Sequence, residues 1–182
     1  MTTERVVLAY KDYEALPADD RRYEIHEGEL HVTPAPSPQH QMIVLNIATL
    51  LHSHVKAKRI GEVLIAPLDV ILSDTTIVQP DIVYLDSVRC GAISRRGVEG
   101  PPTLVVEVLS PSTVLIDRNT KQQLYARFGV PFSWLVDPEG QTIEALVLGV
   151  RGYSLARRAA GTEPVSLPPF PDLTVIPASL WE

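Results

Sequence analysis

Three ionisable residues stand out in this 182-residue sequence because of where they fall. Glu107 interrupts the apolar run from Leu104 to Leu109, a pattern that predicts a strand buried on both faces. A bare carboxylate there would cost several kcal/mol unless it were protonated, paired or bound to a metal. Asp81 begins a second apolar segment, and Lys121 falls one to two turns into a helix predicted over residues 115–128. These residues are the starting point for a functional interpretation.

An enzyme that hydrolyses a phosphodiester bond can use two carboxylates and a lysine in its active site. Carboxylate oxygens are hard ligands that suit Mg²⁺, which keeps several of its own waters, and Mn²⁺ is expected to substitute for it. A bound cation polarises the phosphate and lowers the pKa of a bound water. A nearby lysine can orient that water or stabilise the charged transition state. We therefore expect Asp81 and Glu107 to bind the metal, with Lys121 as the third catalytic residue.

Each of these residues also has a purely structural interpretation. Asp81 could cap a turn and Lys121 could be solvated. Glu107 could pair with an arginine such as Arg118 or Arg127. For Asp81 or Lys121 alone the structural interpretation is favoured, whereas structural ion pairs inside a strand like that of Glu107 are uncommon. The combination of all three residues favours a site.

The composition restricts the class of protein. A chain of this length predicts one domain, with a core over about residues 10–160 and a proline-rich tail over residues 161–182. The formal net charge of −6 opposes tight non-specific binding to nucleic acid, although it leaves room for a nuclease with local basic residues. The single cysteine, Cys90, excludes an internal disulfide. Because the sequence shows no signal-like or membrane-spanning apolar run, we expect a cytoplasmic protein without a membrane partner.

The order of the predicted elements indicates an α+β or α/β fold, with a mixed sheet flanked by helices and with N-terminal and C-terminal hairpins. The periodicity predicts helices over residues 10–16, 39–58 and 115–128. Strands are predicted over residues 22–32 (as a hairpin), 62–72, 76–85, 104–109, 131–136, 142–148 and 152–157. We expect residues 88–100 to form an exposed loop and residues 164–177 to lie irregularly along the surface.

Five segments together carry a resemblance to a known family. They are VVEVLSPST, QPDIVYLD, RYEIHEGEL, TKQQLYARFGVPFSWLVD and the segment around His40, within about Tyr10 to Leu148. On these motifs and their order, the chain resembles the Uma family of restriction-endonuclease-like proteins, which belongs to the PD-(D/E)-x-K nuclease superfamily. The resemblance implies a restriction-endonuclease-like mixed sheet flanked by helices, and metal-dependent cleavage of DNA. By the same resemblance, Asp81 matches the aspartate of the PD pair and Glu107 the second acidic position.

The chain departs from the superfamily pattern at two places. The superfamily usually has its lysine two residues after the second acid, where this chain has Leu109. Lys121 instead matches a lysine that the family carries on the following helix. Phe132-Ser133-Trp134 is the second departure, because the family commonly has an acidic residue and an aromatic before the tryptophan. If that acid takes part in catalysis, this chain would be impaired.

Two further residues are accessory candidates by resemblance. Glu29 matches an acid in the family's Gly-Glu pair and would add an outer metal ligand, although a turn glutamate is more often solvated. His40 stands at a helix start, where a role near phosphate or metal competes with a simple backbone hydrogen bond. Asp117 is expected to N-cap or charge the first turn of the helix that carries Lys121.

These inferences lead to a Mg²⁺-dependent DNA endonuclease, for which a homodimer would suit cleavage of both strands. The main alternative is a catalytically degenerate nuclease-fold module that binds nucleic acid or a protein partner. A hydrolase of another phosphate ester would need a deep pocket in place of an open cleft. A structural protein would pair Glu107 with an arginine and bind no metal.

Overall fold

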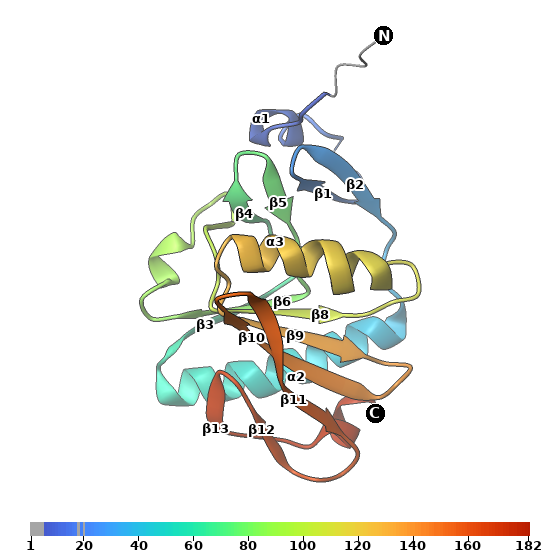
Figure 1. The fold of residues 1–182 in the computed structure, drawn as a ribbon, viewed down its shortest axis with the longest axis vertical. Coiled ribbons are helices and arrows are strands. Elements are labelled where there is room, and N and C mark those ends of the chain that lie inside the picture. Colours follow the sequence, from blue (N-terminus) through green and yellow to red (C-terminus); the bar gives the residue numbers. More distant parts are fainter. Residues whose placement is uncertain (1–5, 18, 20) are drawn as a thin grey trace.

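The centre of the molecule is a six-stranded mixed sheet. Its strands are β3 (Gly61–Ile65), β6 (Ile82–Asp86), β8 (Leu104–Val108), β9 (Phe132–Asp137), β10 (Thr142–Gly149) and β11 (Gly152–Ala160). The computed structural model describes residues 6–17, 19 and 21–182, and it shows the strand order β11-β10-β9-β8-β6-β3 (Figure 1). β8 and β9 run parallel, and the other neighbouring pairs run antiparallel.

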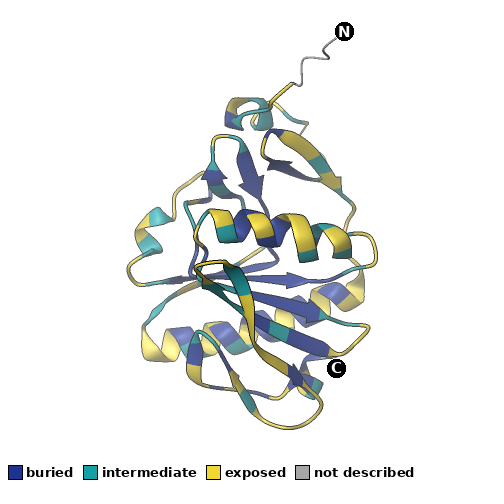
Figure 2. Ribbon diagram, in the orientation of Figure 1, coloured by how far each residue is buried: buried dark blue, intermediate teal, exposed yellow. Residues whose placement is uncertain are grey.

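Helices cover both faces of this sheet. The parallel β8–β9 pair requires a crossover, which consists of a π-helical turn, η2 (Ile116–Lys121), followed by α3 (Gln122–Arg127). These two elements confirm the helix predicted there. Side chains of α3 pack with Val105 on one face, and those of α2 (Pro38–Lys58) pack with Val106 on the other. Figure 2 shows buried and exposed residues alternating along both helices, as expected for amphipathic helices that lie on a sheet.

A second, N-terminal sheet holds part of the candidate site. Its strands in spatial order are β2 (Glu29–Thr33), β1 (Arg22–His26), β5 (Thr76–Val78), β4 (Val70–Ser73) and β7 (Val98–Glu99). β1 and β2 form the predicted hairpin, and Gly28 in its turn has a left-handed φ of 87° that favours glycine. The short helix α1 (Tyr10–Tyr13) packs on this sheet, where Tyr10 clusters with Ile25 and Ile77.

The start of α2 follows from its cap. Ser37 is the N-cap residue, and its hydroxyl accepts a hydrogen bond from the His40 backbone N–H at 3.2 Å. Pro38 occupies the first helical position, where its missing N–H costs nothing. This cap fixes His40 in the first turn of the helix. The inward face of α2 continues with the buried residues Ile43, Ile47, Leu51 and Val55.

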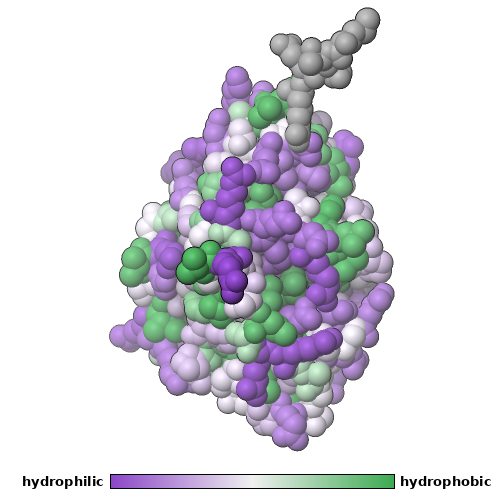
Figure 3. All heavy atoms as spheres, in the orientation of Figure 1, coloured by the Kyte–Doolittle hydropathy of each residue, from purple (hydrophilic) through white to green (hydrophobic). Residues whose placement is uncertain are grey.

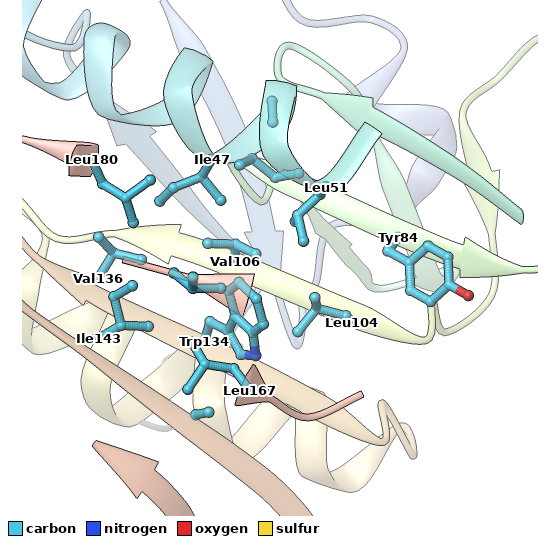
Figure 4. Packing of buried hydrophobic residues seen from close by; sticks show 14 of the residues in the cluster. Ile47, Leu51, Tyr84, Leu104, Val106, Trp134, Val136, Ile143, Leu167 and Leu180 are labelled. Carbon is cyan, nitrogen blue, oxygen red and sulfur yellow. The ribbon is translucent and has the colours of Figure 1, made fainter. Parts of the chain in front are cut away.

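The main hydrophobic core lies between α2 and the six-stranded sheet (Figure 4). It joins side chains of β8 and β9 to side chains near the C-terminus, among them Val106, Trp134 and Leu167. The Trp134 ring packs edge-on against Phe170 with centroids 6.3 Å apart, and its Nε1–H donates to the Pro168 carbonyl oxygen at 2.7 Å. The C-terminal segment is therefore part of the core.

The prediction of an irregular segment over residues 164–177 was wrong. These residues form the paired strands β12 (Val165–Leu167) and β13 (Phe170–Val175), and the short helix η3 (Pro177–Leu180) follows. Their apolar side chains enter the main core. Pro168 and Pro169 fill the turn between the two strands, where no ladder hydrogen bond is lost, and Pro171 lies in β13 of a two-stranded sheet, where both strands are edge strands.

Two predicted strands are each divided in the structure. The segment 62–72 forms β3 and β4, and the segment 76–85 forms β5 and β6, in different sheets. Pro67 and Pro80 lie in the two breaks, and a proline cannot donate a ladder hydrogen bond. The chain crosses between the sheets at both breaks. The second crossing places Asp81 immediately before β6.

The loop expected over residues 88–100 is only partly exposed. It contains the short helix η1 (Cys90–Ala92) and ends in β7, where Val98 is completely buried. β7 pairs in parallel with β4, so the end of the loop is held on the N-terminal sheet.

Hydrophobic and hydrophilic residues are interspersed over the face shown in Figure 3. Within residues 6–17, 19 and 21–182, no helix combines the length and the apolar character needed to cross a membrane. α2 has 21 residues, but its outer face carries exposed polar residues among the apolar ones.

Removal of a large side chain from the β12–β13 pair tests the place of this pair in the core. Phe170 is 2% exposed, and we expect Phe170→Ala to lower the free energy of unfolding by about 3–5 kcal/mol, because it leaves a cavity beside Trp134. Urea unfolding would measure this loss. Leu155 is 56% exposed, so Leu155→Ala is a control that should change stability by less than about 0.5 kcal/mol. Equal effects of the two substitutions would contradict the packing.

Candidate active site

Asp81 and Glu107 face each other across neighbouring strands. Ile82 pairs with Val106, so Asp81 and Glu107 are the next opposed pair, just beyond the end of β6. Opposed residues of an antiparallel pair project to the same face of a sheet, here the face that η2 and α3 cover. The Val108 N–H donates a hydrogen bond to Asp81 Oδ2 at 2.8 Å. This bond fixes the Asp81 carboxylate beside the end of β8.

Lys121 reaches the same place from the crossover between β8 and β9. The residue is 4% exposed, and its Nζ lies 3.0 Å from Glu24 Oε1, 3.2 Å from Glu107 Oε1 and 3.4 Å from Asp117 Oδ1. The Tyr125 hydroxyl also donates a hydrogen bond to Glu107 Oε1. A lysine this deeply buried is charged only because carboxylates surround it. Lys121 therefore joins β1, β8 and η2 through ion pairs.

Arg22 and His40 hold Asp81 from its other side. Arg22 Nη1 lies 3.2 Å from Asp81 Oδ1, and His40 Nε2 lies 3.2 Å from Asp81 Oδ2. Arg22 comes from β1 and His40 from the first turn of α2. Each carboxylate oxygen of Asp81 thus has a polar contact, and the partners come from three other segments of the chain, β1, α2 and β8.

An open cavity of about 330 Å³ gives access to these side chains. We call it the acidic cavity, and its ionisable lining includes Arg22, Glu24, His40, Asp81, Glu107, Asp117 and Lys121. The rest of the wall comes from β2, the proline linker after it, and residues 110–113 after β8. A cavity of this size admits a small ligand or part of a larger one.

Four of the five residues predicted for the site line the acidic cavity, namely Asp81, Glu107, Lys121 and His40. Glu29 does not, because it is exposed on β2, where it pairs in register with His26, and it lies outside the residues that line the cavity. Asp117 lies in the first turn of η2 as expected, but its side chain is buried against Lys121 instead of capping the helix.

Sequence reasoning missed Arg22 and Glu24. Both alternate with the apolar residues Tyr23 and Ile25 along β1, and this alternation indicated that they share one face of the strand. No local pattern indicates that this face meets Lys121, which is remote in the chain.

The arginine partners considered for Glu107 bind other residues. Arg118 Nη1 lies 2.6 Å from Glu144 Oε2, and Arg127 pairs with Glu27. Glu107 has the Lys121 ammonium as its cationic neighbour instead. Its pairing is therefore part of the cavity and not a separate structural bridge.

Burial and the crowding of carboxyl groups both perturb the pKa of Glu107. Burial raises its pKa to about 8, because the opposing charge of Lys121 is offset by nearby negative charges. Those charges belong to Asp117, Asp81 and Glu24. Burial raises the pKa of Asp117 as well, although Lys121 opposes the rise. The raised pKa favours the protonated form of the Glu107 carboxyl group in the metal-free protein.

The pKa values of Asp81 and Glu24 are shifted in the opposite direction, below their usual values. Burial opposes the ionisation of Asp81, but the hydrogen bond from His40 and the charge of Arg22 outweigh it and lower the pKa. Burial also opposes the ionisation of Glu24, and the charge of Lys121 contributes most to lowering its pKa. Burial alone would lower the pKa of Lys121, but the surrounding carboxylates raise it. Asp81 and Glu24 are anions, and Lys121 is a cation.

The carboxyl oxygens of this cluster are ligands that suit a divalent cation. In the part of the chain that the structure describes, the cluster contains two permanent cations, Arg22 and Lys121, and four carboxyl groups: Glu24, Asp81, Glu107 and Asp117. No three His, Cys, Asp or Glu side chains among the described residues converge as ligands of one ion. Mg²⁺ commonly takes one or two carboxylates and keeps several waters. Asp81 and Glu107 would therefore suffice as its protein ligands.

Known proteins match this chain over most of its length. The family described as "Uma2: Putative restriction endonuclease" matches residues 10–179. The chain belongs to the Uma2 family. A crystal structure from Anabaena variabilis ATCC 29413, described as that of "a putative nuclease belonging to DUF820", matches with a TM-score of 0.76 at 20% identity. The match covers 96% of this chain and 97% of that chain, and it shows the fold that this Uma2 protein shares with a solved structure.

A curated relative extends the comparison. The uncharacterized protein slr1290 of Synechocystis sp. is 33% identical to this Uma2 protein over 121 residues. That alignment spans 62% of this chain and 60% of the relative, so the chain matches less than two thirds of the relative's length. The family and the restriction-endonuclease-like fold that the sequence motifs indicated are confirmed. The roles of Asp81, Glu107 and Lys121 stay predictions.

Glutamine at position 107 tests the raised pKa, because it keeps the size of the protonated carboxyl group. Folded wild type holds the Glu107 proton up to about pH 8, whereas the unfolded chain releases it near the usual pKa of 4.5. Between these values the unfolded state binds fewer protons, so the free energy of unfolding falls as the pH rises. We expect Glu107→Gln to gain stability relative to wild type from about pH 6 to about pH 9, in urea unfolding without metal.

The matched control is Glu62→Gln, which makes the same chemical change at an exposed residue of β3. The difference in free energy of unfolding between Glu62→Gln and wild type should be the same at about pH 6 and at about pH 9. A constant difference between wild type and Glu107→Gln across this range would show that Glu107 is ionised throughout, contrary to the raised pKa.

Proposed function

We propose that this Uma2 protein is a Mg²⁺-dependent endonuclease that hydrolyses phosphodiester bonds in DNA, with Mn²⁺ able to substitute. The observation that carries the proposal is the opposed pair of Asp81 and Glu107, buried beside Lys121 at an open cavity. Membership of a restriction-endonuclease family and the shared fold support it.

Asp81 and Glu107 would hold the metal. Asp81 is ready to do so, because its lowered pKa keeps it ionised. Glu107 has to release its proton before both of its oxygens can bind a cation, so that metal and proton compete for it. A bound divalent cation would polarise the phosphate and lower the pKa of its water. The hydrogen bond from Val108 keeps Asp81 in place throughout.

Lys121 supplies a fixed positive charge. Because carboxylates raise its pKa, it remains protonated and cannot act as a general base. Its ion pairs hold the ammonium against Glu107, next to the place where negative charge would develop on a phosphate. Lys121 also lines the acidic cavity, so it could orient the attacking water.

The position of the lysine favours a second candidate, a catalytically degenerate nuclease-fold module that binds nucleic acid or a protein partner. Leu109 occupies the superfamily's usual lysine position and is 5% exposed. The Lys121 ammonium already contacts three carboxyl groups. In such a module the acidic cavity would bind a metal without cleaving DNA.

The proposal includes a cytoplasmic protein that acts as a homodimer. The lone cysteine, Cys90, is a free thiol, which suits a reducing compartment. Two sites related by a two-fold axis would suit cleavage of both strands of a duplex.

Asparagine at position 81 tests the metal site, because it keeps the size of the side chain and removes its charge. We expect wild type to bind Mg²⁺ and Mn²⁺ in calorimetric titrations and to nick supercoiled plasmid in their presence. We expect Asp81→Asn to lose roughly 100-fold or more in both metal affinity and nicking rate, since an anionic ligand is lost.

Asp172→Asn makes the same change at an exposed residue that pairs with Lys58 and lies outside the acidic cavity. This control should bind metal and nick plasmid as wild type does. Metal binding without nicking in wild type would favour the degenerate module. Absence of metal binding in wild type would contradict the proposed function.

A further inference from the structure

A second cavity adjoins the acidic cavity, and we call it the apolar cavity. Its volume is about 430 Å³, within the range of small-molecule sites. Arg22, His40 and Asp81 line both cavities, and the linker over residues 34–36 borders both. The two cavities therefore meet at the ion-paired cluster around Asp81.

The walls of the apolar cavity suit a flat ring. The apolar part of these walls comes from the proline linker, from α2 and from the end of β3, and it includes Pro34, Pro36, Val44, Ile65, Ala66 and Pro67. The polar part of the lining is Asp19, Arg21, Arg22, His40, Gln41, Gln79 and Asp81. Such aliphatic surfaces pack against the face of an aromatic ring by dispersion and exclusion of water.

Three polar side chains that line this cavity have buried atoms without a hydrogen-bond partner in the described structure. Gln79 is 9% exposed, and because its Nε2 donates to Asp69 Oδ1 at 2.8 Å, the unpaired atom Oε1 is an acceptor. His40 is also 9% exposed, and its Nδ1 is unpaired while Nε2 contacts Asp81. Arg22 contacts Asp81 through Nη1, which leaves Nε and Nη2 as unpaired donors.

Unpaired buried polar atoms are rare in folded proteins, and four of the nine among the described residues belong to side chains that line this cavity. A ligand that satisfied them would need both donors and acceptors along one edge, together with apolar faces. A nucleobase has this combination, because its edge carries N–H groups, ring nitrogens and carbonyl oxygens, and its faces stack on flat or apolar surfaces.

We propose that the apolar cavity binds one unstacked nucleobase of the DNA whose phosphate lies at the acidic cavity. This proposal rests on the proposed function and specifies its substrate. A base inside a duplex is stacked and paired, so it enters a protein cavity only when it is single-stranded or flipped out of the helix. The preferred substrate is then single-stranded DNA or duplex DNA with an unpaired nucleotide.

Calorimetric titration of the metal-free protein with nucleotides tests this site without depending on cleavage. The four deoxynucleoside 5′-monophosphates would be compared with 2-deoxyribose 5-phosphate, which has the sugar and phosphate but no base. We expect at least one nucleotide to bind about tenfold or more tightly than the sugar phosphate, because contacts to one base contribute about 1–3 kcal/mol.

Ile65→Ala removes part of the cavity wall at a residue that is 48% exposed, so the variant should fold. Leu45→Ala is the matched control, because Leu45 is 62% exposed and lines neither cavity. We expect Ile65→Ala to weaken nucleotide binding by roughly tenfold and to leave sugar-phosphate binding unchanged. Leu45→Ala should bind both ligands as wild type does.

Equal affinity for nucleotides and sugar phosphate would overturn the base site, and so would an absence of nucleotide binding. Equal losses of nucleotide affinity in Ile65→Ala and Leu45→Ala would overturn it as well. The outcome is separate from that of the nuclease assay. Base-dependent binding without plasmid nicking would leave the base site standing and remove the proposed function. Plasmid nicking without base-dependent binding would support the proposed function and overturn the base site.

Discussion

The site depends on the ion pairs of one buried ammonium group. Lys121 contacts carboxylates from β1, β8 and η2, so it ties the N-terminal sheet to the central sheet and to the crossover helix. Removing its charge would leave several buried carboxyl groups without a cation, which is strongly destabilising. Burial raises the pKa of Glu107, and the same crowding of carboxyl groups adds to this rise. The cluster of carboxyl groups around Lys121 thus explains both how these elements are held together and why the pKa of Glu107 is raised.

The register of the strands decides which acids share this arrangement. β6 and β8 pair so that Asp81 lies opposite Glu107, and alternation turns both side chains toward the crossover helix. The break at Pro80 ends β5 of the N-terminal sheet and lets the chain enter the central sheet as β6. From there Asp81 reaches Arg22 and His40 as well, because both approach from neighbouring elements. A shift of one residue in either strand would separate the two acids.

Local sequence features predicted those parts of the fold that depend on neighbouring residues, such as helix caps and apolar strands. Glu107 stood out because a charge interrupts an apolar strand, and the Ser37 cap marked the start of α2. Glu24 did not stand out, because its importance comes from meeting Lys121, and no local pattern encodes that contact. The divided strands and the β12–β13 pair were missed for a related reason, whereas the predicted C-terminal hairpin is present as β10 and β11. Prolines mark breaks, but tertiary packing decides whether the residues between them pair as strands.

The proton balance of metal binding tests the central claim most directly. Mg²⁺ binding would be measured by calorimetry at about pH 7 in buffers with different ionisation enthalpies, which separates proton release from the heat of binding. If Glu107 keeps its proton until a cation displaces it, roughly one proton will be released for each ion bound. A binding heat that does not depend on the buffer would contradict the account, because Glu107 would then be ionised already or the ion would bind elsewhere.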